Sequence, residues 1–185
     1  MTLNIVTISG SLRKGSFNTA LMRALPGLAP AEFHLSVAPP FDRLPLYNAD
    51  LQVAGFPTEV TTLADAIRKA DGVIIVSPEY NWTIPGGLKN ALDWVSRLEN
   101  QPFKEKPVAI QSATGGPLGG ARMQYHLRMA LTFLNAFVFG TPEVFVGLAQ
   151  TRFDPATREL KDEPTRKVVR DQLAAFAKFI PRVKA

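Results

Sequence analysis

The stretch that decides the fold is "LNIVTISGSLRKGSFNTAL", residues 3–21. Its start, LNIVTI, is a short apolar run rich in β-branched side chains, and it stops at Ser9 as a buried strand does. Further along, the apolar positions change period, because Phe17, Leu21 and Leu25 fall on one face of a helix. The stretch therefore predicts a strand, a glycine-bounded loop and a helix.

The same alternation continues to the end of the chain. Further strands are predicted in "EFHLSV" (32–37), "DGVIIVS" (71–77), "PVAIQS" (107–112) and "AFVFGTPEVFVG" (136–147). Apolar stripes with helical spacing occupy 60–67, 88–98, 123–134 and 169–180. Strict alternation predicts an α/β fold, a doubly wound five-stranded parallel sheet with helices on both faces. No linker or repeat divides the chain, so residues 1–185 are expected to form one domain.

One connection stands apart from this alternation. The segment "APPFDRLPLYNAD", residues 38–50, is rich in proline and is predicted to be a long connection without regular structure.

Composition narrows the possible classes of protein. The chain has 185 residues, 46% of them hydrophobic, which fits a globular domain rather than a disordered one. It has no cysteine, and its two histidines, His34 and His126, are far apart in sequence, so neither a disulfide nor a metal site is expected. The net charge of +5 comes from scattered residues, which favours anionic small molecules over nucleic acid as partners.

The start of the chain predicts where the protein resides. Met1 leads directly into "TLNIVTIS", without the basic segment and long apolar run of a signal peptide. No apolar stretch approaches the roughly 20 residues that a membrane span needs. We expect a cytoplasmic protein without a membrane span.

The predicted sheet also indicates where a ligand binds. In the flavodoxin-like strand order 2-1-3-4-5, ligands bind beyond the carboxyl ends of the strands, at the crevice between the first and third. The loops there are "SGSLRKGSFN", "PEYNWTIPGG" and "SATGGPLGG". They are also the most unusual loops of the chain, so position and composition agree.

The first loop has the glycine spacing of a nucleotide-binding P-loop, with Gly10 and Gly15 in G-x-x-x-x-G. Ser16 and Phe17 stand where Lys and Ser or Thr are required, and no acidic Walker-B partner is evident, which disfavours a nucleoside triphosphatase. The loop still offers anion donors before a helix N-terminus, and these suit one phosphate monoester without a metal. The donors are Ser9, Ser11, Arg13, Ser16 and Asn18. A simple serine-rich helix cap is the alternative.

The other two loops suit a flat ring. Tyr80 and Trp82 offer aromatic surface, and Asn81 with the turn amides can meet a polar ring edge. The loop at 112–120 carries few side chains, so its backbone can approach a planar ligand closely. A turn with core aromatics and a flexible connection are the alternatives. A phosphate monoester joined to a flat, polar-edged ring describes flavin mononucleotide, FMN.

These segments resemble a known family. "GSLRKGSFN", "SPEYNWTIPGGLKNALDWVSR" and "GGARMQYHLR" are similar to the NADPH-dependent FMN reductases, and within them to bacterial chromate and quinone reductases. The resemblance covers essentially the whole chain. It implies a flavodoxin-like fold, noncovalently bound FMN, NADPH or NADH as donor, and a homodimer or homotetramer. It also implies two-electron (hydride) reduction of quinones by a ping-pong mechanism, with chromate, ferricyanide and azo dyes as further candidate acceptors.

The resemblance also assigns site residues by position. Those expected to hold the phosphate are Ser11, Arg13, Ser16, Phe17 and Asn18. Those expected to line the ring are Pro78, Glu79, Tyr80 and Asn81, with Ser112, Thr114, Gly115 and Gly116 opposite. No side chain is assigned as an acid–base catalyst or a metal ligand. Trp82 departs from the residues that relatives often carry, and is expected to reshape the acceptor side.

A few further side chains carry expectations. Glu79 is expected to point away from the ring and bond backbone or a neighbouring subunit, and His126 to lie at a surface or interface. Trp94 fits the core and an interface equally well. Arg122, Tyr125 and Glu143 are weak candidates for a network between subunits. The alternative function is a flavodoxin-like electron carrier, which the basic pI of about 9.7 disfavours, because carriers usually present an acidic face.

Overall fold

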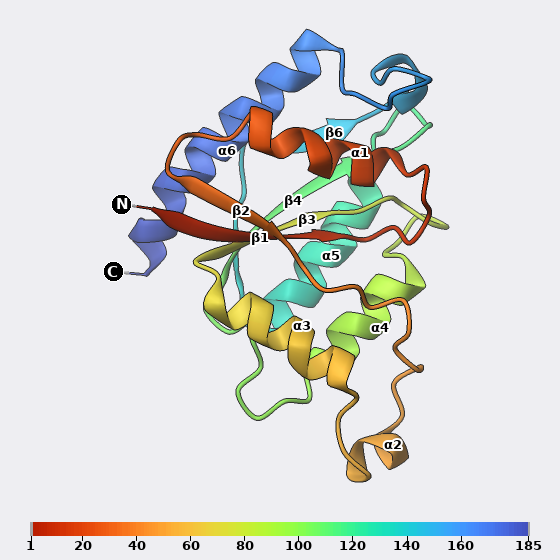
Figure 1. Ribbon diagram of the computed structural model, residues 1–185, viewed down its shortest axis with the longest axis vertical. Helices are drawn as coiled ribbons and strands as arrows, with labels where there is room; N and C mark the ends of the chain where they lie inside the picture. The colour runs from red at the N-terminus through yellow and green to blue at the C-terminus, as the bar shows by residue number, and fades with distance from the viewer. Residues whose placement is uncertain (1, 185) are drawn as a thin grey trace.

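The sheet lies at the centre of the computed structural model, which describes residues 2–184, with helices on both faces (Figure 1). Its strands are β1 Leu3–Ser9, β2 Phe33–Val37, β3 Gly72–Val76, β4 Pro107–Ala113, β5 Phe137–Val138 and β6 Val144–Val146. All neighbours pair in parallel in the order β2-β1-β3-β4-β5, and β6 also pairs with β4. The predicted flavodoxin-like strand order is confirmed.

The helices divide between the two faces of the sheet. They are α1 Phe17–Ala24, α2 Ala49–Val53, α3 Thr58–Lys69, α4 Gly86–Val95, α5 Ala121–Phe133 and α6 Glu163–Val183. Helices α1 and α6 pack against one face, and α3, α4 and α5 pack against the other (Figure 1). Short 3-10 turns, Leu25–Gly27 and Ala149–Thr151, follow α1 and β6. No helix within residues 2–184 is long and apolar enough to cross a membrane.

Strand β3 shows why the central strands read as continuous apolar runs. Successive side chains of a strand point to opposite faces. Val73 and Ile75 accordingly belong to the core under α3, α4 and α5, whereas Ile74 and Val76 belong to the core under α1 and α6. All four side chains are fully buried. A strand covered on both faces has no solvent-facing position, so it shows no polar alternation.

Gly10 brings the carboxyl ends of β1 and β3 together. A Cβ at this position would lie 2.3 Å from Oγ and 2.6 Å from Cβ of Ser77, closer than such atoms can approach. The Gly10 N–H also donates to the carbonyl of Val76 at 2.9 Å. The glycine is therefore required by the contact between two strand ends, at the edge of the sheet where the strand order predicts the ligand.

Two predictions of local structure need correction. The single fifth strand predicted within 136–147 is divided into β5 and β6, separated by Gly140 and Pro142, and proline has no N–H to donate to a sheet. The proline-rich connection is not wholly irregular either. It runs into α2, since the Asn48 side chain accepts the Asp50 N–H at 2.9 Å and caps a helix of one turn.

Trp94 lies in the core and anchors that long connection. Its side chain is fully buried, and its Nε1–H donates to the carbonyl of Pro45 at 2.8 Å. The ring of Tyr47 packs edge-on against it at 5.1 Å between centroids. Of the two environments that the sequence leaves open for Trp94, the core is therefore the one observed.

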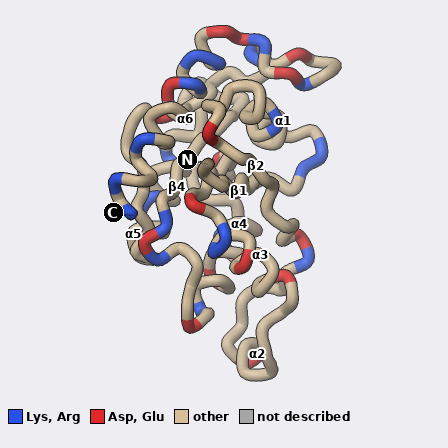
Figure 2. The backbone as a smooth tube through the Cα atoms, turned by 60° about the vertical axis from the view of Figure 1, so that its left-hand side comes forward, with Lys and Arg blue, Asp and Glu red and all other residues tan. Residues whose placement is uncertain are grey.

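Lys and Arg are interspersed with Asp and Glu along the chain (Figure 2). This agrees with the scattered origin of the +5 net charge.

Candidate functional site

A cavity of about 210 Å³ opens where the sequence places the ligand, at the carboxyl ends of β1, β3 and β4. It is lined by Ser11, Arg13, Ser16, Phe17, Asn18, Pro78, Glu79, Tyr80, Ala113, Thr114 and Gly115. All of these except Ala113 are among the predicted site residues. Three loops far apart in sequence thus meet at one site, because parallel strands bring their carboxyl ends to the same edge of the sheet.

The first loop presents unused hydrogen-bond donors to the cavity. Ser16 caps α1, and its Oγ accepts the backbone N–H groups of Asn18 at 3.2 Å and of Thr19 at 3.4 Å. The Ser11 Oγ likewise accepts the Arg13 N–H at 3.3 Å. Both hydroxyls accept in these contacts and keep their own O–H for a ligand.

Two more donors of this loop are unused. Within residues 2–184, neither the Arg13 guanidinium nor the backbone N–H of Phe17 donates a hydrogen bond. Phe17 opens α1, where N–H groups point out of the helix and favour an anion. The donor set is therefore two hydroxyls, one guanidinium and a helix start, with no lysine and no acidic side chain.

Asn18 connects the first loop to the third. Its Nδ2 donates to the carbonyl of Ala113 at 2.8 Å, and its Oδ1 accepts the Ala113 N–H at 2.9 Å. The residue is 2% exposed, and this pair ties the first turn of α1 to the end of β4. Asn18 lines the cavity, and its main role there is to join the first loop to the third. Ala113 itself carries no side-chain signal that could predict this contact.

Three predicted site residues lie outside the cavity lining: Asn81, Ser112 and Gly116. Ser112 is fully buried, where its hydroxyl donates to the carbonyl of Gly119 and its Oγ accepts Gln124 Nε2 at 2.8 Å. The Gly116 carbonyl accepts the Leu148 N–H at 3.0 Å. These two residues shape the third loop from behind, and Asn81 lies in a turn at the rim.

Glu79 bonds backbone, as expected. Its Oε2 accepts the N–H of Met123 at 3.0 Å in the first turn of α5, where the helix dipole favours a carboxylate. Its Oε1 lies 3.7 Å from Nη1 of Arg122. Because this carboxylate is committed to α5, it serves to fix the second loop.

Within residues 2–184, no hydrogen bond or ion pair joins Arg122, Tyr125 and Glu143 to one another, and their network between subunits stays a prediction. Within the chain, Glu143 pairs with Arg128 at 3.3 Å. Arg122 lies beside Glu79 and over the Trp82 ring. His126 is exposed, as expected, and its Nδ1 lies 2.8 Å from the Thr83 hydroxyl.

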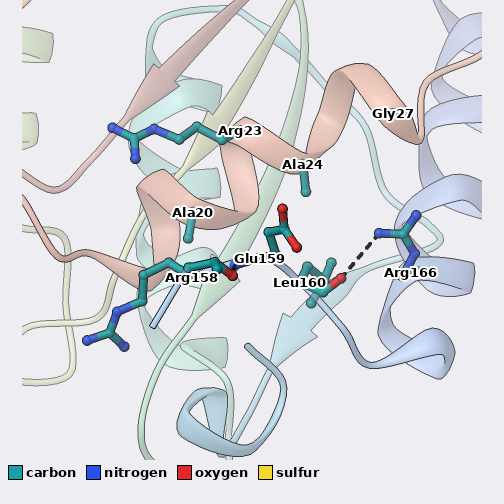
Figure 3. A pocket seen from close by; sticks show the side chains of 9 residues that line it. Ala20, Arg23, Ala24, Gly27, Arg158, Glu159, Leu160 and Arg166 are labelled. Carbon is teal, nitrogen blue, oxygen red and sulfur yellow. Dashed lines mark hydrogen bonds between the residues drawn. The ribbon is translucent and has the colours of Figure 1, made fainter. Parts of the chain in front are cut away.

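A larger hollow of about 550 Å³ lies elsewhere, between α1 and the segment before α6. Figure 3 shows that its arginines do not converge. Arg23 and Arg158 both extend to the left of this view, away from Arg166, and Arg166 donates to the Leu160 carbonyl at 3.2 Å. No donor set comparable with that of the first loop gathers there, so the smaller cavity is the better candidate.

The described residues offer no metal centre. Among residues 2–184, no group of three or more His, Asp or Glu side chains is placed to hold an ion.

The chain is similar in sequence to known reductases over almost its whole length. The family model described as NADPH-dependent FMN reductase matches residues 3–151. The chain is 52% identical over 183 residues to a quinone reductase of Escherichia coli, covering 98% of this chain and 97% of that one. It is 41% identical over 182 residues to an NAD(P)H-dependent FMN reductase of Pseudomonas aeruginosa, with the same two coverages.

Solved structures with a similar fold include a flavoenzyme and a flavodoxin. The flavoenzyme NAD(P)H:(acceptor) oxidoreductase FerB from Paracoccus denitrificans superposes with a TM-score of 0.87 at 32% identity, covering 98% of both chains. A flavodoxin from Pseudomonas aeruginosa superposes with a TM-score of 0.54 at 15% identity, over 99% of this chain and all of that one. The second likeness concerns the fold alone.

Proposed function

Because this chain belongs to the NADPH-dependent FMN reductase family, we propose that it reduces quinones by two electrons, with NADPH or NADH as donor. Quinones are proposed as acceptors because a relative with 52% identity is a quinone reductase. The observation that carries the proposal is the metal-free donor set of the first loop, which matches the phosphate of FMN. Ser11, Arg13, Ser16 and Phe17 would hold that phosphate.

The rest of the cavity fits the same group. Pro78, Tyr80 and Thr114 line it beyond the phosphate donors and offer flat or apolar surface to a ring. Gly115 leaves backbone accessible there, with only the end of the Gln150 side chain within 4 Å of the position a Cβ would take. FMN held by these residues would supply the hydride-transfer chemistry between the nicotinamide donor and the acceptor.

The protein's own part is to bind and orient. Glu79 is held by α5, so we assign it no proton transfer. Tyr80 is 46% exposed and serves as a ring wall. With one face of the ring serving donor and acceptor in turn, the kinetics would be ping-pong.

We further propose that the protein is a cytoplasmic homodimer or homotetramer. A single chain provides a cavity of about 210 Å³, whereas complete small-molecule pockets measure about 300–1,000 Å³. A second copy covering the open side would complete the enclosure. Chromate, ferricyanide and azo dyes are further candidate acceptors.

The test begins with the purified protein. We expect flavin absorption, release of FMN on denaturation, bleaching by NADPH or NADH under anaerobic conditions, and menadione turnover with parallel double-reciprocal lines. Bleaching by neither nicotinamide would overturn the enzyme assignment. Bleaching without quinone turnover would leave a reductase of another acceptor class. Reduction only by a protein partner would favour an electron carrier.

A further inference from the structure

A buried glutamine on α5 holds the strand that leads into the third loop. The Nε2 of Gln124 donates to Ser112 Oγ, near the end of β4, at 2.8 Å, and to the carbonyl of Val144, in β6, at 2.9 Å. Both Gln124 and Ser112 are fully buried. Because only the NH2 group can donate to a carbonyl, the Val144 oxygen also fixes which way the amide is turned. All of these contacts lie inside one subunit.

Ser112 connects Gln124 to the far end of the third loop. Its hydroxyl donates to the carbonyl of Gly119. Gly119 and Gly120 have φ angles of +60° and +89°, and a Cβ at Gly120 would lie 2.8 Å from Cβ of Ser112. A Cβ at Gly119 would lie 2.6 Å from the carbonyl carbon of Phe145. The loop is therefore packed against β4 and β6 too closely for any residue but glycine at these two positions.

The start of the loop is bonded to the segment after β6. The Thr114 carbonyl accepts the Ala149 N–H at 3.0 Å. The Gly116 carbonyl accepts the Leu148 N–H, also at 3.0 Å. In contrast, the N–H of Gly115, which lines the cavity, donates no hydrogen bond within residues 2–184. The loop thus offers the cavity a backbone donor, which favours negative charge on a bound ring.

Gln124 has one polar atom that its surroundings leave unpaired. Its Oε1 is buried and accepts no hydrogen bond from the described residues. A buried acceptor without a donor lowers stability, and an apolar side chain of similar size would avoid that cost. What a glutamine adds here is the pair of N–H donors that reach Ser112 and Val144. Stability of the core alone therefore does not explain a glutamine at this position.

We propose that Gln124 is a positioning residue of the flavin site, which acts through Ser112 to hold the third loop in the conformation that favours reduced FMN. The inference deepens the proposed function and rests on it. The ring of reduced FMN carries more negative charge than that of oxidised FMN, so a fixed N–H donor favours the reduced form. A donor already in place needs no reorganisation, whereas a loop released from Ser112 would have to be ordered first. Gln124 itself does not line the cavity.

Gln172 provides a matched control, because it is a second buried glutamine that holds β4, from the opposite face of the sheet. It lies on α6, is 1% exposed, and its Nε2 donates to the Pro142 carbonyl at 2.8 Å. Its Oε1 accepts Gln111 Nε2 at 2.9 Å. Among the described residues, Gln172 bonds none that belongs to the third loop. Gln172→Leu therefore removes a comparable amide without releasing the loop.

The test measures the reduction potential of FMN in the holoenzyme, by equilibration with a reference dye. We expect Gln124→Leu to weaken the binding of reduced FMN relative to oxidised FMN by about 3- to 10-fold, the effect of one misplaced hydrogen bond. For a two-electron couple this change lowers the midpoint potential by about 15–30 mV. Gln172→Leu should keep the wild-type potential. An unchanged potential in Gln124→Leu, or an equal fall in both variants, would overturn the proposal.

Ser112→Ala tests the same link by a smaller change, which keeps the test decisive if Gln124→Leu does not fold. It removes the hydroxyl that bonds Gly119, so the potential should fall by a similar amount. Where Gln124→Leu folds, the double variant should shift the potential by less than the sum of the two single shifts, because both act through one link. A full sum, or an unchanged potential in Ser112→Ala, would contradict the proposal.

The kinetics of the two half-reactions separates positioning from a general loss of structure. A lower potential should slow reduction of the bound flavin by NADPH and leave its reoxidation by menadione as fast or faster. A general loss of structure would slow both steps, and that result would overturn the proposal. Wild-type protein that bound no FMN would refute the proposed function itself, whereas bound FMN with an unchanged potential in the variants would refute this inference alone.

Discussion

Trp82 shows how a single residue can be unfavourable for its local backbone and still be well held. Its positive φ costs free energy in a bulky residue, of the order of 1–2 kcal/mol. The stacked Arg122 and the contacts of Glu79 and Thr83 with α5 offset part of that cost. Backbone conformations of this kind gather at functional sites, where the surrounding structure determines them.

The Trp82–Arg122 contact is measurable as a coupling energy. Trp82→Ala, Arg122→Gln and the double variant form a cycle in urea unfolding. We expect a favourable coupling of about 0.5–1 kcal/mol, the usual range for an exposed cation–π pair. The same cycle made with Trp82 and Arg182, in the last turn of α6, should give no coupling. A coupling of zero for Trp82 and Arg122 would show that their stack does not persist in solution.

Arg13 is expected to carry much of the phosphate affinity. Arg13→Ala should weaken FMN binding by about 1–3 kcal/mol, as the loss of one charge-assisted contact does. Lys14→Ala is the matched control, because Lys14 is the adjacent exposed cation and does not line the cavity. Fluorescence titration of the apoprotein with FMN measures both. Equal effects of the two substitutions would remove Arg13 from direct phosphate contact.

At the scale of elements, the site depends on contacts between segments that are distant in sequence. Asn18 ties α1 to β4, Gly10 lets β1 approach β3, and Glu79 ties the second loop to α5. Each contact involves at least one helix or strand. The cavity is therefore positioned by the sheet and its helices.

Breaking the link between α1 and β4 is expected to lower the free energy of unfolding. Asn18→Ala leaves the Ala113 N–H and carbonyl without their partner in a buried place, so we expect a loss of about 2–4 kcal/mol in the free energy of unfolding. Asn18→Asp keeps the acceptor for the Ala113 N–H and should lose less stability. Chemical denaturation of the three proteins is the measurement. Equal losses in the two variants would contradict the two-bond account.

Lys106 gives the molecule a stability term that depends on pH. Its Nζ donates to the carbonyls of Arg68, at 3.2 Å, and of Ala70, which end α3. The pKa of Lys106 is lowered to about 8, chiefly by burial and also by the nearby charge of Lys184, whereas Asp71 opposes both. Unfolded lysine titrates near 10.4, so between these values the unfolded chain binds more protons and the free energy of unfolding rises with pH.

That sign can be checked with Lys106→Met. Wild-type stability minus variant stability should increase between pH 8 and pH 10, because the buried ammonium loses its proton over that range only in the folded wild type. Thermal unfolding across this range measures the difference. A difference that stays constant, or that falls, would show that Lys106 is not disfavoured in its charged form.

At the scale of the whole molecule, the family match and the near-complete coverage of two named relatives confirm the predicted FMN-dependent NAD(P)H oxidoreductase class. The confirmed class agrees with the site. The cavity lies at the strand ends where a flavodoxin-like sheet binds ligands, and its donors suit an anion without a metal.

Ligand binding should be visible as whole-molecule stability. FMN at 100 times its dissociation constant should add about 2.7 kcal/mol to the free energy of unfolding, since it binds the folded state. Riboflavin, which lacks the phosphate, should give a much smaller rise in Tm at the same concentration. Thermal melts of the apoprotein with each flavin test this. An equal rise with riboflavin would show that the first loop contributes no phosphate affinity.

The sequence by itself determined the alternation of strands and helices, the strand order and most of the cavity lining. Periodicity and glycine-bounded loops are local signals, and parallel strands place their following loops at one edge of the sheet. Ser11, Arg13 and Ser16 could be predicted for this reason.

Only the tertiary structure decided which side chains meet across that edge. It divided the fifth strand, buried Trp94, turned Ser112 toward α5 and placed Arg122 on Trp82. These outcomes depend on contacts between residues far apart in the chain, whose geometry is set by packing. No local pattern of residues encodes them.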